Sequence, residues 1–182
     1  MNVTNLKYKQ KGTFAIEFAI VGLFLGILLM VTIDSTIKIS TKGKLDRLSF
    51  SSVNLLKERT QLYNESYLTT QADADLVFDV VKSSFGRTLE SFDSTKFGAL
   101  IEEQTYQSDG TANTLVTYAE GTNCQPAQTL SSVEGDLSVV TSWGRQATLY
   151  RVTLCYETEN LIANLLNAGF TTVQSSSVIV GR

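Results

Sequence analysis

Histidine is absent from this sequence of 182 residues, proline occurs once, and only two cysteines are present. Histidine is the most frequent general base of enzymes and the most frequent metal ligand, so the usual centre of either kind of site is missing. The chain also has no G-x-S-x-G motif, no P-loop and no dinucleotide-binding fingerprint. We therefore expect a protein that is not an enzyme, with no catalytic residue, no metal, no cofactor and no small-molecule substrate.

Two groups of carboxylates leave this expectation unchanged. Glu102 and Glu103 are neighbours in an expected strand, where adjacent side chains face opposite ways, so the two cannot converge on one substrate. Asp73, Asp75 and Asp79 lack the glycine and the distal glutamate of a calcium-binding EF-hand loop. We expect these three aspartates at the solvated start of a helix.

Charged residues are also nearly missing from positions 13–33, which read TFAIEFAIVGLFLGILLMVTI. As a helix, these 21 residues would rise about 31 Å, close to the thickness of a bilayer core. We therefore expect one membrane span. A secretory signal peptide is the alternative, because lysines precede the run, but no small-x-small cleavage site follows it. Basic residues flank the run on both sides, so charge alone leaves its orientation open.

Glu17 is the single charged residue within this run. An ionisable group at membrane depth costs about 2.5–3.5 kcal/mol on insertion scales, so such a group is usually retained for a function. If the helix is a simple membrane anchor, the Glu17 side chain could extend to the lipid headgroups. Alternatively, a cationic partner could neutralise its charge. Farther along, Gly22 and Gly26 form a G-x-x-x-G pattern that allows membrane helices to pack closely, although glycine is common in such helices in any case.

Helical periodicity continues beyond the apolar run to about residue 63. Apolar and small side chains recur on one face there, so this aqueous half of the helix (34–63) needs a packing partner. A second helix within 71–92 can provide it. The faces expected to point inward are Leu45, Leu48, Ser52, Leu55, Leu56 and Leu62 in the first helix, and Ala74, Val77, Phe78, Val81, Phe85 and Leu89 in the second.

A sheet is expected in the remaining chain, because β-branched and aromatic residues cluster in short segments. The expected strands are 100–106, 115–119, 147–156 and a last one within 170–182, with a short helix at 159–167 and loops at 64–70, 121–136 and 141–146. Trp143, Tyr150 and Tyr156 could line a binding surface, but aromatic residues near strands usually belong to the core. The expected fold class is α+β: a long N-terminal helix that carries a small head, residues 64–182, with an antiparallel sheet.

Cys124 and Cys155 have no neighbouring cysteine or histidine at the spacing of a metal site. In an exported domain they would form a disulfide, which closes a loop of about 30 residues and contributes roughly 3–4 kcal/mol in the chain-entropy model. In a reducing compartment they would remain two buried thiols.

The stretch KGTFAIEF combines three features: a short basic leader, a glycine that ends it, and a glutamate five residues later at the start of an apolar helix. This resembles the processing site of type IV pilins and pseudopilins. The resemblance implies that residues 1–12 are a leader and that a prepilin peptidase cuts after Gly12 on the cytoplasmic side. Thr13 would become the first residue of a mature inner-membrane protein with a periplasmic head. Glu17 could then neutralise the new α-amine of Thr13, within one chain or from a neighbour.

A narrower resemblance adds a system to this interpretation. The stretches KGTFAIEF, KGKLDRLSFSSVNLLKERTQLYN, YRVTLCYE and AGFTTVQSSSVIVGR are similar to TadF, the minor pseudopilin family of the tight adherence (Tad, or Flp) pilus. The resemblance implies a type IV pilin-like fold, a role in pilus assembly for adhesion and biofilm formation, and a TadE-like partner beside other assembly proteins. Two residues depart from related pilins: Phe18 stands where the major Flp pilins have tyrosine, and Thr13 leaves N-methylation of the mature end open.

Two other functions remain open at this point. A pseudopilin of a type II secretion system would share the cleavage logic, whereas a signal-anchored periplasmic receptor or ligand-binding domain would keep its leader. Loss of residues 1–12 removes three lysines, so the mature chain would have 12 basic and 18 acidic residues. This acidic balance disfavours binding to nucleic acid.

Overall fold

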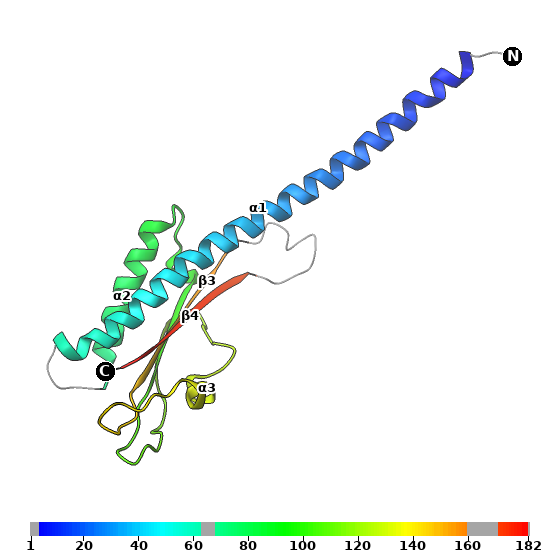
Figure 1. Cartoon of the computed structure of the whole chain (residues 1–182). Helices are drawn as coiled ribbons and strands as arrows, with labels where there is room; N and C mark the ends of the chain where they lie inside the picture. Colours follow the sequence, from blue (N-terminus) through cyan, green and yellow to red (C-terminus); the bar gives the residue numbers. More distant parts are fainter. Residues whose placement is uncertain (1–3, 63–67, 160–170, 182) are drawn as a thin grey trace. The chain divides into compact units, whose positions relative to one another are not determined.

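The computed structural model describes residues 4–62, 68–159 and 171–181 (Figure 1). The chain forms two units, one made of Met1–Ile39 with Glu159–Phe170 and the other of Ser40–Thr158 with Thr171–Arg182. A single helix, α1 (Thr4–Leu62), supplies residues to both units. The prediction of one helix that continues from the apolar run to about residue 63 is confirmed, and the helix also includes residues 4–12 of the expected leader.

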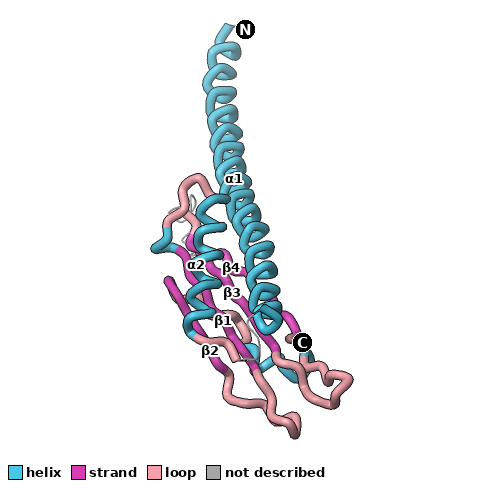
Figure 2. Tube along the Cα trace, turned by 90° about the vertical axis from the view of Figure 1, so that its left-hand side faces the viewer, coloured by secondary structure: helices cyan, strands magenta, loops and turns pink. Residues whose placement is uncertain are grey.

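The second unit contains a four-stranded antiparallel sheet (Figure 2). Its strands lie in the order β2-β1-β3-β4, with β1 (Phe97–Gln104) and β3 (Leu149–Glu157) in the centre and β2 (Val116–Gly121) and β4 (Thr172–Val180) at the edges. Each of the four predicted strands is present, and their ends differ from the expected ones by a few residues. Together with the helices, this sheet confirms the α+β, pilin-like fold class.

Helix α2 (Gln71–Thr88) begins at a complete capping box. The Thr70 hydroxyl accepts the Asp73 N–H, and the Asp73 carboxylate accepts the Thr70 N–H at 2.9 Å, so two backbone donors at the helix start are satisfied. The predicted inward face of α2 is confirmed, because Ala74, Val77, Phe78, Val81 and Phe85 are all buried. Leu89, the C-cap residue, is partly buried against the same core.

The main core of the second unit lies on one face of the sheet, beneath α2 and the second half of α1. Leu45, Val53 and Leu56 of α1 are buried there, and Leu48 packs at the margin. Leu55, which was expected to face inward, is 37% exposed, and the side chain of Leu62 lies outside the described residues. Most of the predicted leucine face therefore does meet the partner that its periodicity required.

An aromatic cluster joins α2 to the sheet at one end of this core. Phe85 lies 5.1 Å from Tyr156 and 5.7 Å from Phe92, both edge to face, and 6.0 Å from Phe97, measured between ring centroids. Such arrangements add about 0.5–1.5 kcal/mol to the free energy gained from burial. Phe85 is therefore a central residue of the core.

The opposite face of the sheet is covered in part by α3 (Leu130–Leu137) and the segment that leads into it. The prediction that all of residues 121–136 form a loop is wrong for this helix. Serines and Gly135 give it little intrinsic helical preference, and tertiary contacts stabilise it instead. The Leu130 side chain is fully buried, and its N–H donates to Glu102 Oε1 at 3.0 Å. The helix expected at 159–167 falls almost entirely outside the described residues.

Polar contacts attach α1 to the edge strand β4. The Ser49 hydroxyl lies 2.8 Å from that of Ser177 and 3.2 Å from that of Ser175. The Ser175 hydroxyl donates to the Asp46 carboxylate, which is also 3.2 Å from Lys42 Nζ. The bond from Ser175, followed by the bond and charge of Lys42, lowers the pKa of Asp46 below its usual value, and burial opposes them.

Replacing Phe85 by alanine is predicted to lower the free energy of unfolding by about 3–5 kcal/mol, because a fully buried ring is removed from a packed cluster. Leu76→Ala, a change on the same helix at a residue that is 56% exposed, is the matched control and should cost about 0.5 kcal/mol or less. Urea unfolding of the full chain in detergent, followed by near-UV circular dichroism, measures both. Equal losses in the two variants would contradict this assignment of the core.

The contact between Asp46 and Ser175 predicts a pH dependence of stability. Because the pKa of Asp46 is lower in the folded chain than its ordinary value of 3.8, its ionised form stabilises the fold at neutral pH. This contribution is lost as the pH falls from about 4 through the folded pKa. At pH 7, Asp46→Asn should cost less than about 1 kcal/mol, since half of the side chain is in water.

Unfolding free energies measured from pH 7 to pH 2.5 provide the test. The difference between wild type and Asp46→Asn should shrink on the acid side of pH 4. In a Ser175→Ala background this shrinkage should be smaller, because the main cause of the lowered pKa is gone. Parallel pH profiles of wild type and Asp46→Asn would rule out the proposed ionisation effect.

Candidate functional site

The first part of α1 carries apolar side chains on every side. Each described residue from Gly12 to Ile33 is exposed in the chain by itself, and Phe14, Phe18 and Phe24 are each at least 70% exposed. A helix that is apolar all round needs an apolar surrounding, either lipid or other helices. Among the described residues, α1 is the one helix long and apolar enough to cross a membrane, judged by length and composition.

Gly12, Thr13 and Glu17 lie within this continuous helix. Thr13 and Glu17 are four residues apart, so they lie about 6 Å apart along the axis and on nearly the same face. Within the described residues, Glu17 has no ion-pair partner. Phe18 follows it and stacks on Phe14, with ring centroids 6.5 Å apart. The structure therefore places the expected site residues on one accessible stretch of helix.

Gly22 and Gly26 lie farther along this helix. No atom outside the helix backbone lies within 4 Å of the position that a Cβ would occupy at either glycine. At 100° per residue, the two glycines lie about 140° and 180° around the axis from Glu17. The small-residue face and the acidic face of the helix thus point in nearly opposite directions.

The hydroxyl groups near the end of the apolar run are satisfied by the helix itself. Thr32 donates to the Leu29 carbonyl at 2.8 Å, and Ser35 donates to the Val31 carbonyl at 2.8 Å. Asp34, the first charged residue after the run, forms an ion pair with Lys38 at 2.6 Å. The hydroxyls of Thr32 and Ser35 can lie near lipid at little cost, because their donors are already bonded. The ion pair of Asp34 with Lys38 marks the polar end of the apolar run.

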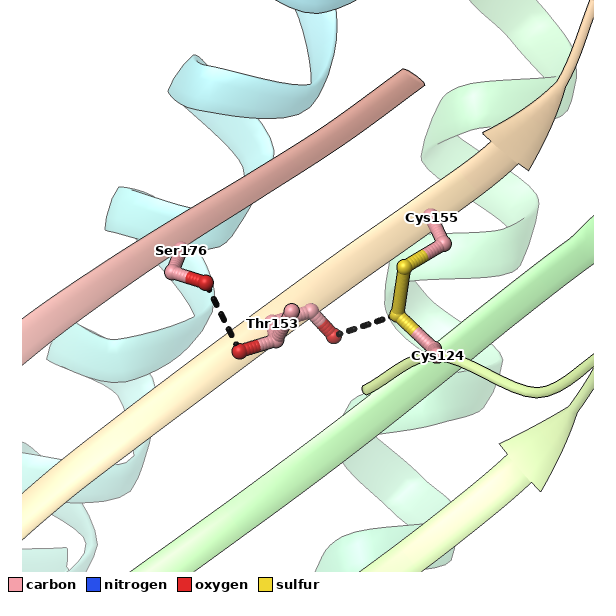
Figure 3. The surroundings of a disulfide bond; sticks show 4 residues. All are labelled: Cys124, Thr153, Cys155 and Ser176. Atoms are coloured by element: carbon pink, nitrogen blue, oxygen red, sulfur yellow. Dashed lines mark hydrogen bonds between the residues drawn. A yellow bond between two sulfur atoms is a disulfide. The ribbon is translucent and has the colours of Figure 1, made fainter. Parts of the chain in front are cut away.

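Cys124 and Cys155 form a disulfide in the head (Figure 3), with an S–S distance of 2.03 Å. The bond ties the segment that follows β2 to strand β3. Cys124 Sγ also lies 3.7 Å from the Thr153 carbonyl oxygen, and the Thr153 hydroxyl lies 2.8 Å from the Ser176 hydroxyl of β4 (Figure 3). The disulfide and these contacts connect the loop, the central strand and the edge strand.

Glu102 and Glu103 lie on opposite faces of β1, as predicted. Glu102 forms a buried ion pair with Arg151, its direct neighbour on β3, and Glu103 accepts the Thr69 N–H at 2.8 Å on the other face. The pairing of Glu102 with Arg151 was missed at the sequence level, since 49 residues separate the two and neither has a distinctive neighbour pattern. Both glutamates have structural partners that hold them apart.

The remaining residues singled out by sequence do not gather into a site. Asp73 caps α2 and Asp75 accepts a hydrogen bond from Gln71, and no group of three or more His, Cys, Asp or Glu in the described part of the chain could hold a metal ion. Tyr150 and Tyr156 belong to the core, whereas Trp143 is 87% exposed at the tip of a turn.

The comparisons with known proteins identify the family. The model of the TadF family, "Putative tight adherence pilin protein F", matches residues 5–182, nearly the whole chain. No curated protein and no solved structure matches the sequence. The matched region includes both the apolar helix and the head, so it covers every feature described above. The chain therefore belongs to the TadF family of tight adherence pilin proteins.

Proposed function

We propose that this protein is a minor pseudopilin that a prepilin peptidase cuts after Gly12 and that acts in the assembly of a Tad (Flp) pilus. The observation that carries the proposal is the first part of α1, which exposes apolar side chains on all sides and contains one acidic residue, in a chain of the TadF family. Lipid covers such a surface before assembly, and the helices of other subunits cover it afterwards. The role is therefore one of assembly, with no chemistry at the head.

The position of Glu17 provides a physical reason for cleavage after Gly12. Cleavage after Gly12 creates an α-amine on Thr13, one helical turn from the Glu17 carboxylate. A cation and an anion in an apolar surrounding are each costly alone and much less costly as a pair. The pair can form within one chain or between staggered subunits, and in the second case it sets the register of assembly.

Close packing of neighbouring helices needs a second feature, and the glycine pair provides it. Gly22 and Gly26 leave an open strip on the side of the helix away from Glu17. A neighbouring helix can approach that strip more closely than it can approach a face of leucine and phenylalanine. One subunit can thus use its two faces for two neighbours at once.

The proposed location is the bacterial inner membrane, crossed once, with the leader in the cytoplasm and the head in the periplasm. The disulfide between Cys124 and Cys155 supports this orientation, because disulfides persist in oxidising compartments. The proposed partners are the prepilin peptidase, a TadE-like pseudopilin and the other Tad assembly proteins. The resulting pilus would serve adhesion and biofilm formation.

The mature N-terminus provides the first test. Mass spectrometry of the protein purified from membranes is predicted to find a chain that begins at Thr13, and Gly12→Ala should prevent the cut. Glu17→Gln should be processed and inserted normally but should lower piliation at least tenfold, because the α-amine loses its anionic partner. Electron microscopy and a shear assay of surface pili measure the effect.

Glu17→Asp, which keeps the charge on a shorter side chain, is the matched control and should retain part of the piliation. A chain that still begins at Met1 in piliated cells would overturn the processing step and favour a simple membrane anchor. Wild-type piliation by Glu17→Gln would overturn the role of the carboxylate.

The disulfide predicts both the compartment and the stability of the head. In the protein isolated from cells, Cys124 and Cys155 should react with a maleimide only after reduction. The double variant Cys124→Ser/Cys155→Ser should lose about 3–4 kcal/mol of unfolding free energy, because the bond closes a loop between residues 31 apart. Free thiols in the freshly isolated, folded protein would contradict a periplasmic head.

A further inference from the structure

Strand β4 is an edge of the sheet, and the hydrogen bonds at its two ends show which backbone groups face outward. The Thr158 N–H donates to the Thr171 carbonyl, and the Gly181 N–H donates to the Thr148 carbonyl. In an antiparallel ladder, residues that bond to the neighbouring strand alternate with residues whose N–H and C=O point the other way. The odd-numbered residues of β4 therefore bond to β3, and the outward groups belong to Thr172, Gln174, Ser176, Val178 and Val180.

This outer row of groups is open. Among the described residues, its one recorded partner is Lys42 Nζ, which lies 3.5 Å from the Gln174 carbonyl oxygen. Ser176 and Val178, in the middle of the strand, are exposed. The row thus offers alternating donors and acceptors in the pattern that only another extended backbone matches fully.

The features that usually protect an edge strand are missing from β4. Natural edges are short or carry charged residues, proline or a bulge, whereas β4 has nine residues in continuous register with β3 and no charge or proline. The opposite edge, β2, differs: it has six residues, and its Glu120 pairs with Lys82 at 3.2 Å. The β2 edge is therefore protected by its own length and charge, whereas the β4 edge has one contact, that of Lys42 with the Gln174 carbonyl.

The space beside β4 suits an additional strand. A shallow cavity of about 440 Å³ borders this edge, lined on the helix side by Lys42 and Asp46 and on the other side by Pro126, Ala127 and Gln128. Arg151 of β3 also lines the cavity. Lys42 pairs with Asp46 and Arg151 pairs with Glu102, and the remaining lining residues are uncharged. A charged side chain would lose water here without gaining an unpaired partner, so an uncharged segment fits best.

We infer that the outer edge of β4 binds an extended, uncharged segment of another polypeptide by β-strand addition. A second copy of this chain fits less well. The contacts of Ser49 with Ser175 and Ser177 place α1 over β4, and an antiparallel twofold pair would put both α1 helices on the same side. Paired strands lie about 4.8 Å apart, whereas packed helix axes need about 8–10 Å. A strand from a partner without a helix at that position avoids this conflict.

Amide hydrogen exchange of the full chain in detergent, followed by NMR, tests the inference. The probe is an acetylated and amidated peptide of alternating threonine and valine, methylated on every second backbone nitrogen. One edge of the extended peptide can then pair with β4, whereas the methylated edge cannot pair with a further peptide, so fibrils do not form. At ten times its dissociation constant, the peptide should slow exchange at Gln174, Ser176 and Val178 about tenfold. The same peptide methylated on every nitrogen is the control and should have no effect.

Ser176→Pro provides the complementary variant. It removes an N–H that points outward and leaves the ladder to β3 intact, since proline is tolerated at an edge strand in this position. Peptide affinity should fall at least tenfold while the exchange of Ser175 and Ser177 stays slow. If Ser176→Pro does not fold, the two peptides decide the question on the wild-type chain.

Three results would overturn the inference: no slowing by the free-edged peptide, equal slowing by both peptides, or slow exchange of Ser176 and Val178 in the chain alone. Protection that grows with protein concentration and needs no peptide would show a second copy at this edge, which also overturns it. None of these measurements depends on processing or piliation, so the inference can fail while the proposed function holds.

Discussion

The packing of the second half of α1 against the sheet is the constraint on which the head depends. Three apolar residues of α1, with the inward face of α2, complete a core that four strands alone would leave open to water. A sheet of this size needs a covered face to be stable by itself, and here the cover is part of the same helix that carries the apolar run. The head therefore cannot lose α1 without losing its core.

One continuous helix thus meets two different requirements. Within residues 45–56, Leu45, Val53 and Leu56 are buried in the core with α2 and the sheet. Residues 13–33, by contrast, carry apolar side chains on every face of the helix, and each of them is exposed. Glu17, Gly22 and Gly26 interrupt the apolar surface of residues 13–33. Glu17 provides a negative charge, and the two glycines allow a closer helix contact than leucine does. Under the proposed function, these interruptions are the places where subunits recognise one another.

The two edges of the sheet in the head also differ from each other. The β2 edge carries an ion pair with α2, and the β4 edge keeps its outward backbone groups accessible beside a polar cluster of serines, Lys42 and Asp46. Both faces of the sheet bury their charged residues in pairs or hydrogen bonds, as with Glu102 and Arg151. The head thus has a stable interior and one side suited to a further strand.

Local pattern was enough to predict much of this protein. The apolar run, the helical periodicity through residue 62 and the inward face of α2 follow from spacing alone, because helix geometry repeats over a few residues. The strands followed from β-branched and aromatic composition, and the family resemblance rested on short stretches at both ends of the chain. Tertiary structure alone decided the short helix α3, the ion pair of Glu102 with Arg151, the serine contacts of Ser49 and the edge position of β4. Each of these depends on strand order and register between residues tens of positions apart, which no local spacing contains.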